Sequence, residues 1–246
     1  MTSTCLITGA SSGIGQQLAL HYAAKGWTVY AVARSKDKLN ELAKNAGIVA
    51  LPLDMTDNAA IQRTAQQLLN DGVVLDLLLL NAGTCEYVDA LDLALDAFQR
   101  TFAINFHAVV AATKYFMPLL KASLNPQLAI VSSMAHFFPF TRAEAYGASK
   151  AAVSYLADSL RLDLADSGIS VHLIEPGFVD TPLTQKNDFA MPFLVTVEQA
   201  AERIFNGLQA GKSRIRFPRR LSCMLKLLSL LPYNLRNKVA QRMKQQ

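Results

Sequence analysis

Near its N-terminus the chain carries Thr8-Gly9-Ala10-Ser11-Ser12-Gly13-Ile14-Gly15. This loop follows an apolar run, Cys5–Thr8, and leads into a helical pattern over 14–25. Three glycines in such a turn let the chain bend sharply, let a pyrophosphate approach the backbone, and let the helix pack closely on the strand. Free N–H groups and the helix dipole favour an anion at this end of the helix. The loop therefore predicts a phosphate-binding turn, although a plain turn would use the same glycines.

Short apolar runs alternate with helical patterns along the rest of the chain. The expected strands are Cys5–Thr8, Thr28–Ala33, Ile48–Leu53, Leu75–Leu80, Leu128–Ser132, Ile169–Ile174 and a weaker Arg214–Phe217. The expected helices cover 14–25, 36–45, 57–70, 95–121, 145–166 and 196–210, with caps at Asp57 and Thr196. Strands that are apolar at nearly every position are buried on both faces, as in a parallel sheet with helices on either side. The pattern predicts an α/β, doubly wound fold in one domain.

The net charge of +5 is unevenly distributed. Residues 212–246 hold ten basic residues and no acid, so residues 1–211 carry 14 basic and 19 acidic residues, a net charge of −5. We expect residues 1–218 to form the main domain and 219–246 to form a basic amphipathic tail that extends it, with Pro232 as an interruption.

Three interpretations of this tail remain open. Leu221, Leu225, Leu228 and Leu231 could pack on the body or on a second subunit and close a cleft there. Alternatively, leucines beside many cations are typical of a peripheral membrane contact, here through residues 219–244. Nucleic-acid binding is the weakest interpretation, since interleaved aromatic residues are sparse. We therefore expect no nucleic-acid partner.

Other features narrow the class of protein. Three cysteines, Cys5, Cys85 and Cys223, include no CxxC pair, so neither a disulfide framework nor a metal site is expected. The first residues lack the basic segment of a secretory signal, and the longest apolar run of the tail is too short to span a bilayer. A cytoplasmic protein, with peripheral membrane attachment as the alternative, is the expectation.

The glycine spacing and further motifs resemble the short-chain dehydrogenase/reductase family, in its form of about 250 residues. The matching segments, in family order, are TGASSGIG from Thr8, Asn81-Ala82-Gly83, Asn105, Ser133, Tyr146 to Lys150, Pro176-Gly177 and Thr181. The resemblance implies a single Rossmann-type doubly wound parallel sheet with helices on both faces, and a homo-oligomer assembled through helices 95–121 and 145–166.

The resemblance implies a nicotinamide dinucleotide cofactor. Its expected binding residues are Gly9, Ser11, Ser12, Gly13, Ile14, Gly15, Arg34, Asp54, Asn81, Ala82, Gly83, Tyr146, Lys150, Pro176, Gly177, Val179 and Thr181. The second expected strand ends in Ala33-Arg34 without an acid, and a guanidinium there suits a ribose 2′-phosphate. NADP(H) is therefore expected in preference to NAD(H). Asp54, which the family places on the adenine, could instead only cap a turn.

Tyr146 and Lys150 lie four residues apart, on one face of the expected helix. An ammonium and an oxidised nicotinamide beside a phenol would lower its pKa and suit it to general acid–base chemistry. By the resemblance, the catalytic residues are Asn105, Ser133, Tyr146 and Lys150. Ser133 would hold the substrate oxygen, and Asn105 would hold a water or only satisfy its helix. Ser132 is the competing serine.

The expected function is an NADP(H)-dependent oxidoreductase that interconverts a carbonyl and a secondary alcohol on a small molecule. Phe137, Phe138, Phe140, Phe178, Phe189 and Phe193 predict an apolar cleft, with about half of them in the core. His136, where the family often has glycine, is expected on the pocket wall or the surface. The alternative function is a catalytically silent NADP-binding regulatory or scaffold protein.

Overall fold

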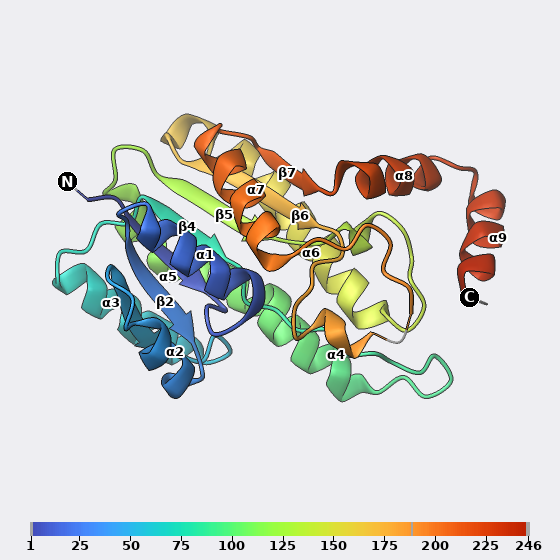
Figure 1. Cartoon of the computed structure of the whole chain (residues 1–246), viewed down its shortest axis with the longest axis horizontal. Helices are drawn as coiled ribbons and strands as arrows, with labels where there is room; N and C mark the ends of the chain where they lie inside the picture. The colour runs from blue at the N-terminus through green and yellow to red at the C-terminus, as the bar shows by residue number, and fades with distance from the viewer. Residues whose placement is uncertain (1, 188, 245–246) are drawn as a thin grey trace.

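The computed structural model describes residues 2–187 and 189–244 and contains a seven-stranded parallel sheet (Figure 1). The strand order is β3-β2-β1-β4-β5-β6-β7. The strands are β1 (Thr4–Thr8), β2 (Thr28–Ala33), β3 (Ile48–Pro52), β4 (Leu77–Leu80), β5 (Gln127–Val131), β6 (Ser170–Pro176) and β7 (Arg214–Phe217). The order runs outward in both directions from β1 and β4, which confirms the doubly wound, Rossmann-type fold.

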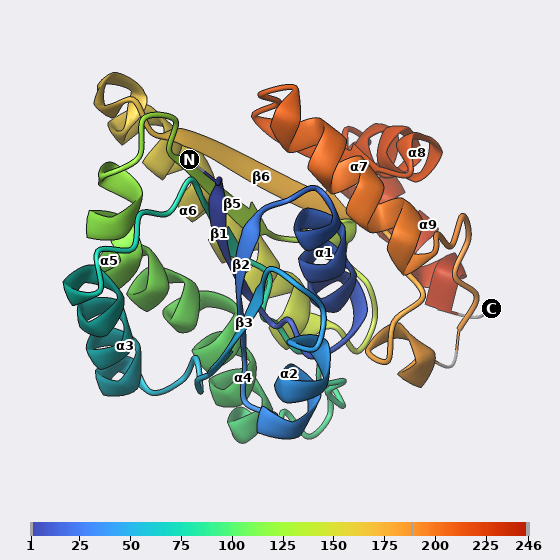
Figure 2. The same ribbon diagram turned by 60° about the vertical axis from the view of Figure 1, so that its left-hand side comes forward.

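Helices cover both faces of the sheet (Figure 2). One face carries α1 (Gly13–Ala24), α2 (Lys36–Leu42) and α7 (Val197–Gln209). The other carries α3 (Asn58–Asn70), α5 (Ala108–Lys121) and α6 (Glu144–Asp163), with α4 (Leu95–Phe102) packed on α6. Each layer encloses its own hydrophobic core.

Alternate residues of each strand enter the two cores. In β1, Cys5 and Ile7 join the core under α1 and α7, whereas Leu6 joins the core under α3, α5 and α6. All three side chains are fully buried. The apolar runs of the sequence therefore reflect burial on both faces, and Cys5 is a buried small side chain, as expected.

The helix expected over 95–121 is interrupted. A π-helical turn, Ala103–His107, separates α4 from α5 and contains Asn105. The two expected caps are present, because the side chain of Asp57 accepts a hydrogen bond from Ala60 N and that of Thr196 accepts one from Gln199 N.

The C-terminal segment forms two helices on either side of Pro232, α8 (Arg219–Ser229) and α9 (Tyr233–Lys244). Figure 1 shows them beyond the end of β7, at the end of the sheet where the strands finish. Leu221 and Leu225 are buried against Met134 and Phe138. Within the described part of the chain, no helix has the length and apolar character needed to cross a membrane.

Candidate active site

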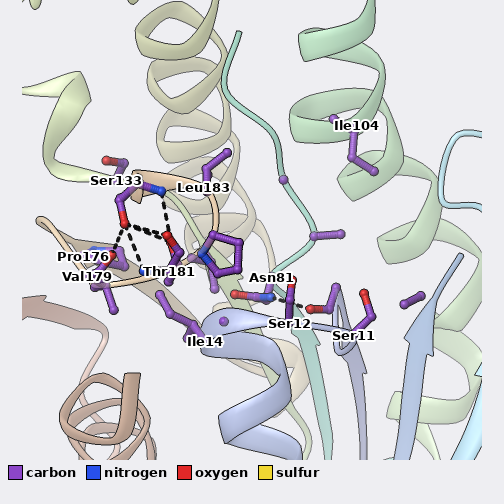
Figure 3. A pocket seen from close by; sticks show the side chains of 18 of the residues that line it. Ser11, Ser12, Ile14, Asn81, Ile104, Ser133, Pro176, Val179, Thr181 and Leu183 are labelled. Carbon is purple, nitrogen blue, oxygen red and sulfur yellow. Dashed lines mark hydrogen bonds between the residues drawn. The ribbon is translucent and has the colours of Figure 1, made fainter. Parts of the chain in front are cut away.

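A cavity of about 330 Å³ lies at the carboxyl ends of β1, β2, β3, β4, β5 and β6. Figure 3 shows Ser133, Pro176, Val179 and Thr181 toward one end of it and Ser11, Ser12 and Ile104 toward the other. The expected site residues that line it are Gly9, Ser11, Ser12, Gly13, Ile14, Arg34, Asn81, Ala82, Gly83, Ser133, Tyr146, Lys150, Pro176, Gly177, Val179 and Thr181. Gly15, Asp54 and Asn105 are not among the lining residues.

The glycine loop leaves no room for a side chain at Gly9 or Gly15. A Cβ on Gly9, whose φ is +70°, would lie 2.9 Å from the Ala82 Cα, and one on Gly15 would lie 2.3 Å from the Gly9 carbonyl oxygen. Gly15 therefore allows α1 to pack closely against the backbone of Gly9, and it does not line the cavity. Ser12 precedes α1 without a side-chain cap on its N–H groups, which leaves these donors available to an anion. The loop thus fits a pyrophosphate.

Thr8 is a site residue that the sequence analysis missed. Its Oγ1 accepts hydrogen bonds from Asn81 N at 2.9 Å and Ala82 N at 3.0 Å, and its carbonyl accepts one from Asn81 Nδ2 at 3.0 Å. These bonds fix the loop after β4 to the glycine loop. The only signal in the sequence is a hydroxyl at the last position of the first strand.

The end of β2 presents Arg34, which is exposed and lines the cavity. Asp54 lies near it but bonds within its own turn, because its Oδ1 accepts from Thr56 N at 2.9 Å and from Thr56 Oγ1 at 2.8 Å. These bonds, with a contribution from Arg34, lower the pKa of Asp54. Its neighbours Leu53 and Met55 line the cavity in its place.

Ser133, Tyr146 and Lys150 meet at the inner end of the cavity. Ser133 lies two residues after the end of β5 and hydrogen-bonds Tyr146, which lies in the first turn of α6. Lys150, one turn further, is 4% exposed and donates from Nζ to the Val131 carbonyl at 2.9 Å. Its Nζ is 5.9 Å from the centroid of the Tyr146 ring.

Burial dominates the electrostatics of this group. It raises the pKa of Tyr146 to about 12, against the lowering effect of the Ser133 hydrogen bond. It lowers the pKa of Lys150 to about 8. Lys150 is not among the groups that set this pKa, and the lowering expected from Lys150 together with the charge of an oxidised nicotinamide stays a prediction. The phenol is protonated at neutral pH and can serve as a proton donor.

The structure separates the two neighbouring serines. Ser132 Oγ donates to the Lys150 carbonyl at 2.9 Å and bonds Ser154 Oγ at 2.7 Å. Both partners belong to α6, so Ser132 holds that helix on the sheet, although it also lines the cavity. Ser133 is the serine that contacts Tyr146.

Asn105 is fully buried in the π-helical turn. Its Oδ1 accepts from Thr84 N at 2.8 Å, and its Nδ2 donates to the Thr84 carbonyl and to Ser149 Oγ, both at 2.9 Å. The side chain thus joins the loop after β4 to α6. All its hydrogen bonds go to neighbouring protein groups, which agrees with one of the two expectations for Asn105. The water that it is expected to hold stays a prediction.

A second, smaller cavity of about 100 Å³ adjoins the first at Ser133 and Tyr146. Three of the six expected aromatic residues line it, Phe140, Phe178 and Phe189. Phe138 is in the core, Phe137 packs against that core, and Phe193 is 43% exposed. Leu221 and Leu225 of α8 complete the wall. The tail therefore closes this cavity, as one of its three interpretations predicts.

His136 does not line either cavity. Its side chain is 15% exposed, and its Nε2 lies 2.6 Å from Oε1 of the fully buried Glu175. The expected place on the pocket wall is therefore wrong, and only a small part of the side chain reaches the surface. A buried carboxylate needs hydrogen-bond partners, and His136 is one of them.

The loop after β6 is held by Thr184, a second residue that the sequence analysis missed. Its Oγ1 accepts from Thr181 N at 3.0 Å and donates to the Val179 carbonyl at 2.5 Å.

Among the residues that the structure describes, no cluster of three or more His, Cys, Asp or Glu side chains could hold a metal ion.

Comparisons with known proteins agree with this geometry. A family model described as short chain dehydrogenase matches residues 3–191. An uncharacterized oxidoreductase of Myxococcus xanthus is 34% identical, over 98% of this chain and 97% of its own. Two solved short-chain dehydrogenases share the fold. One, from Burkholderia cenocepacia in complex with NADP, has a TM-score of 0.84 at 21% identity and covers 98% and 97% of the two chains. The other, from Burkholderia phymatum in complex with NAD, has a TM-score of 0.83 at 20% identity over 92% of each chain.

Proposed function

The chain belongs to the short-chain dehydrogenase family, and from that premise we propose that it interconverts a carbonyl and a secondary alcohol on an apolar small molecule with NADP(H). The observation that carries the proposal is the position of Tyr146 and Ser133, which line both cavities at the place where they adjoin. A group held in the larger cavity and one held in the smaller cavity would meet at these two hydroxyls.

The proposed chemistry uses the protonated phenol. Tyr146, with its pKa raised to about 12 by burial, donates its proton to the carbonyl oxygen during reduction. Ser133 Oγ donates a hydrogen bond to the same oxygen and so fixes the substrate. Lys150 lines the larger cavity, and its Nζ, which donates to the Val131 carbonyl, would bind a ribose hydroxyl of the cofactor there. The dinucleotide supplies the hydride.

The smaller cavity supports an apolar substrate. Its walls include Phe140, Phe178, Phe189, Leu221 and Leu225, beside the two hydroxyls that would hold the reacting oxygen. Such a lining, apolar with a few convergent polar groups, is typical of small-molecule sites.

The preference for NADP(H) is supported by the end of β2. Arg34 lines the cavity there and is exposed, and β2 itself carries no Asp or Glu. A planar guanidinium can pair with a phosphate through two hydrogen bonds. An acid at this position would instead favour the ribose hydroxyl of NAD.

We also propose that the chain assembles with copies of itself through α5 and α6. Val110, Tyr155 and Leu162 are apolar residues of these helices that are 41%, 78% and 78% exposed.

Residues 219–246 are, in this proposal, an extension of the catalytic domain and not a separate unit.

Tyr146→Phe tests the proposed reaction. We expect it to lose more than about 10²-fold in NADPH-dependent carbonyl reduction, the scale of acid catalysis, and to keep NADPH binding. Tyr30→Phe, on β2 and outside both cavities, is the matched control and should keep its activity. Assays would follow NADPH oxidation over a panel of apolar carbonyls and measure NADPH affinity by fluorescence. Equal turnover by both variants would remove Tyr146 from the mechanism, whereas NADPH binding by the wild type without turnover on any carbonyl would favour a cofactor-binding regulator.

A further inference from the structure

Helix α8 is apolar on two faces. On the inner face, Leu221 and Leu225 are 2% and 1% exposed and line the smaller cavity. On the outer face, Met224, Leu227 and Leu230, which follows the helix, are 38%, 67% and 80% exposed. The inner face is accounted for by the cavity. The outer face lacks a partner among the residues that the structure describes.

Cationic side chains surround this outer face. Arg219, Arg220 and Lys226 lie on α8 itself and are exposed. Arg219 and Arg220 also border a groove of about 720 Å³, together with Arg203 and Lys212 from α7 and the turn before β7. In the described part of the chain none of these cations forms an ion pair. The groove and the helix thus present positive charge next to exposed leucines.

The start of α9 continues the same composition. Tyr233 and Leu235 are 67% and 48% exposed, and Lys238 is exposed one turn later. Both helices lie at one end of the molecule, past the last strand (Figure 1). Tyrosine suits a boundary between water and hydrocarbon, because its ring is apolar and its hydroxyl is polar.

We propose that α8 and the start of α9 dock on an anionic lipid bilayer, so that an apolar substrate reaches the smaller cavity from the lipid. The positive charge of this segment favours an anionic surface as its partner, because residues 212–246 hold ten basic residues and no acid. Lysine and arginine near an anionic membrane strengthen binding, and exposed leucines add burial in the interface. A second copy that docked the same face would place cation against cation.

The position of α8 connects this docking to the site. Its inner leucines form the cavity wall, so the helix that touches lipid would also separate lipid from the place where Ser133 and Tyr146 meet. This part of the inference rests on the proposed function, since it assumes a substrate in the smaller cavity. The docking itself does not require turnover and can be measured without it.

Co-sedimentation of the full chain with vesicles tests the docking. The probes are vesicles of phosphatidylcholine alone and vesicles in which part of it is replaced by phosphatidylglycerol. We expect binding to the anionic vesicles, little binding to the neutral ones, and weakening by added salt. The double variant Leu227→Ser, Leu230→Ser should bind at least about tenfold more weakly, because two exposed leucines are removed. The matched control is Leu91→Ser, Leu124→Ser, which changes leucines that are 98% and 97% exposed elsewhere.

Two further measurements make the outcomes decisive. The increase in melting temperature with NADPH should be equal in wild type and both double variants, which shows that fold and cofactor site are intact. Vesicle binding with no turnover on any carbonyl would retain the docking and reject the proposed function. Turnover without vesicle binding would retain the proposed function and reject the docking. A change in solution mass in the Leu227, Leu230 variant, without vesicle binding in wild type, would identify a second copy as the occupant and overturn the proposal.

Discussion

Glu175 is the most completely buried carboxylate of the site region, with a side chain that is 0% exposed. His136 Nε2 lies 2.6 Å from it, Arg216 Nε 2.5 Å and Arg214 Nη1 3.4 Å. Glu175 directly precedes Pro176-Gly177, and His136 follows Ser133 by three residues. The group therefore ties the loop of Ser133 to the loop after β6 that borders the larger cavity.

We expect Glu175→Gln to lower the free energy of unfolding by about 3 kcal/mol. Removal of one partner from a buried charged group typically costs about 3–5 kcal/mol. The lower value applies because Arg214 and Arg216 remain 33% and 20% exposed. Urea unfolding at pH 7 would measure the loss. Glu41→Gln, which breaks an ion pair with side chains about 70% exposed, is the control and should lose less than about 1 kcal/mol.

The effect of Glu175→Gln should depend on pH. Burial raises the pKa of Glu175, but the hydrogen bonds of His136 and Arg216 bring it below its ordinary value overall. A carboxyl with a lower pKa in the folded protein contributes stability above its unfolded pKa and loses it as the pH falls through the folded pKa. The difference between wild type and variant should be full at pH 7 and shrink below pH of about 4.3. A difference that is constant from pH 7 to pH 3 would contradict this role.

No spacing in the sequence predicts this pair. His136 and Glu175 are 39 residues apart, and each belongs to a different loop or strand. Tyr146 and Lys150 could be paired from the sequence because a helix brings residues four apart to one face. A contact between two separate elements depends on how the strands are ordered and how the chain leaves each of them.

At the scale of elements, the π-helical turn is the feature that shapes the site. It places Asn105 where its side chain bonds Thr84 in one direction and Ser149 in the other. Gly83 lies beside it, and a Cβ there would be 3.1 Å from Asn105 Oδ1 and 3.4 Å from Lys150 Nζ. The turn thus holds the loop after β4 close to Lys150.

Asn105→Ala should destabilise this turn by at least about 2 kcal/mol. It leaves the amide and carbonyl of Thr84 without their partner, and each such group costs about 1–3 kcal/mol when it stays buried. Urea unfolding measures the loss, and hydrogen exchange at the Thr84 amide should accelerate. Asn58→Ala, at an exposed position in α3, is the control and should stay within about 0.5 kcal/mol. Unchanged exchange at Thr84 would show that the asparagine is not what holds the loop.

The elements themselves were largely predictable, and the exceptions have physical causes. Seven strands and the main helices follow from runs such as Leu77–Leu80, because burial on both faces leaves a continuous apolar signal. The turn at Ala103–His107 left no such signal, since one extra residue per turn barely changes the helical pattern across 95–121. Helix α8 shows a third case: its leucines predict an amphipathic segment but not which of two apolar faces meets the body.

At the scale of the whole molecule, the larger cavity joins both halves of the sheet. Its wall is made by the ends of six strands, from Leu53 after β3 to Thr181 after β6. A dinucleotide bound across these ends would stabilise the folded chain as one unit. Binding to the folded state alone adds about 2.7 kcal/mol when the ligand concentration is 100 times its Kd. The melting temperature therefore reports how well each cofactor fits the complete site.

NADPH should raise the melting temperature more than NADH at the same concentration. At 100 times its Kd we expect an increase of about 5–10 °C, because 1 kcal/mol corresponds to about 2–4 °C in a chain of this size. Arg34→Asp should reduce the NADPH effect to that of NADH or below it, since a carboxylate would repel the 2′-phosphate and accept a ribose hydroxyl instead. Lys38→Asp, an equal change of charge at an exposed position of α2 away from the cavity, is the control and should keep the preference. If NADH stabilises the wild type as strongly as NADPH, or if both variants respond alike, Arg34 does not select the cofactor.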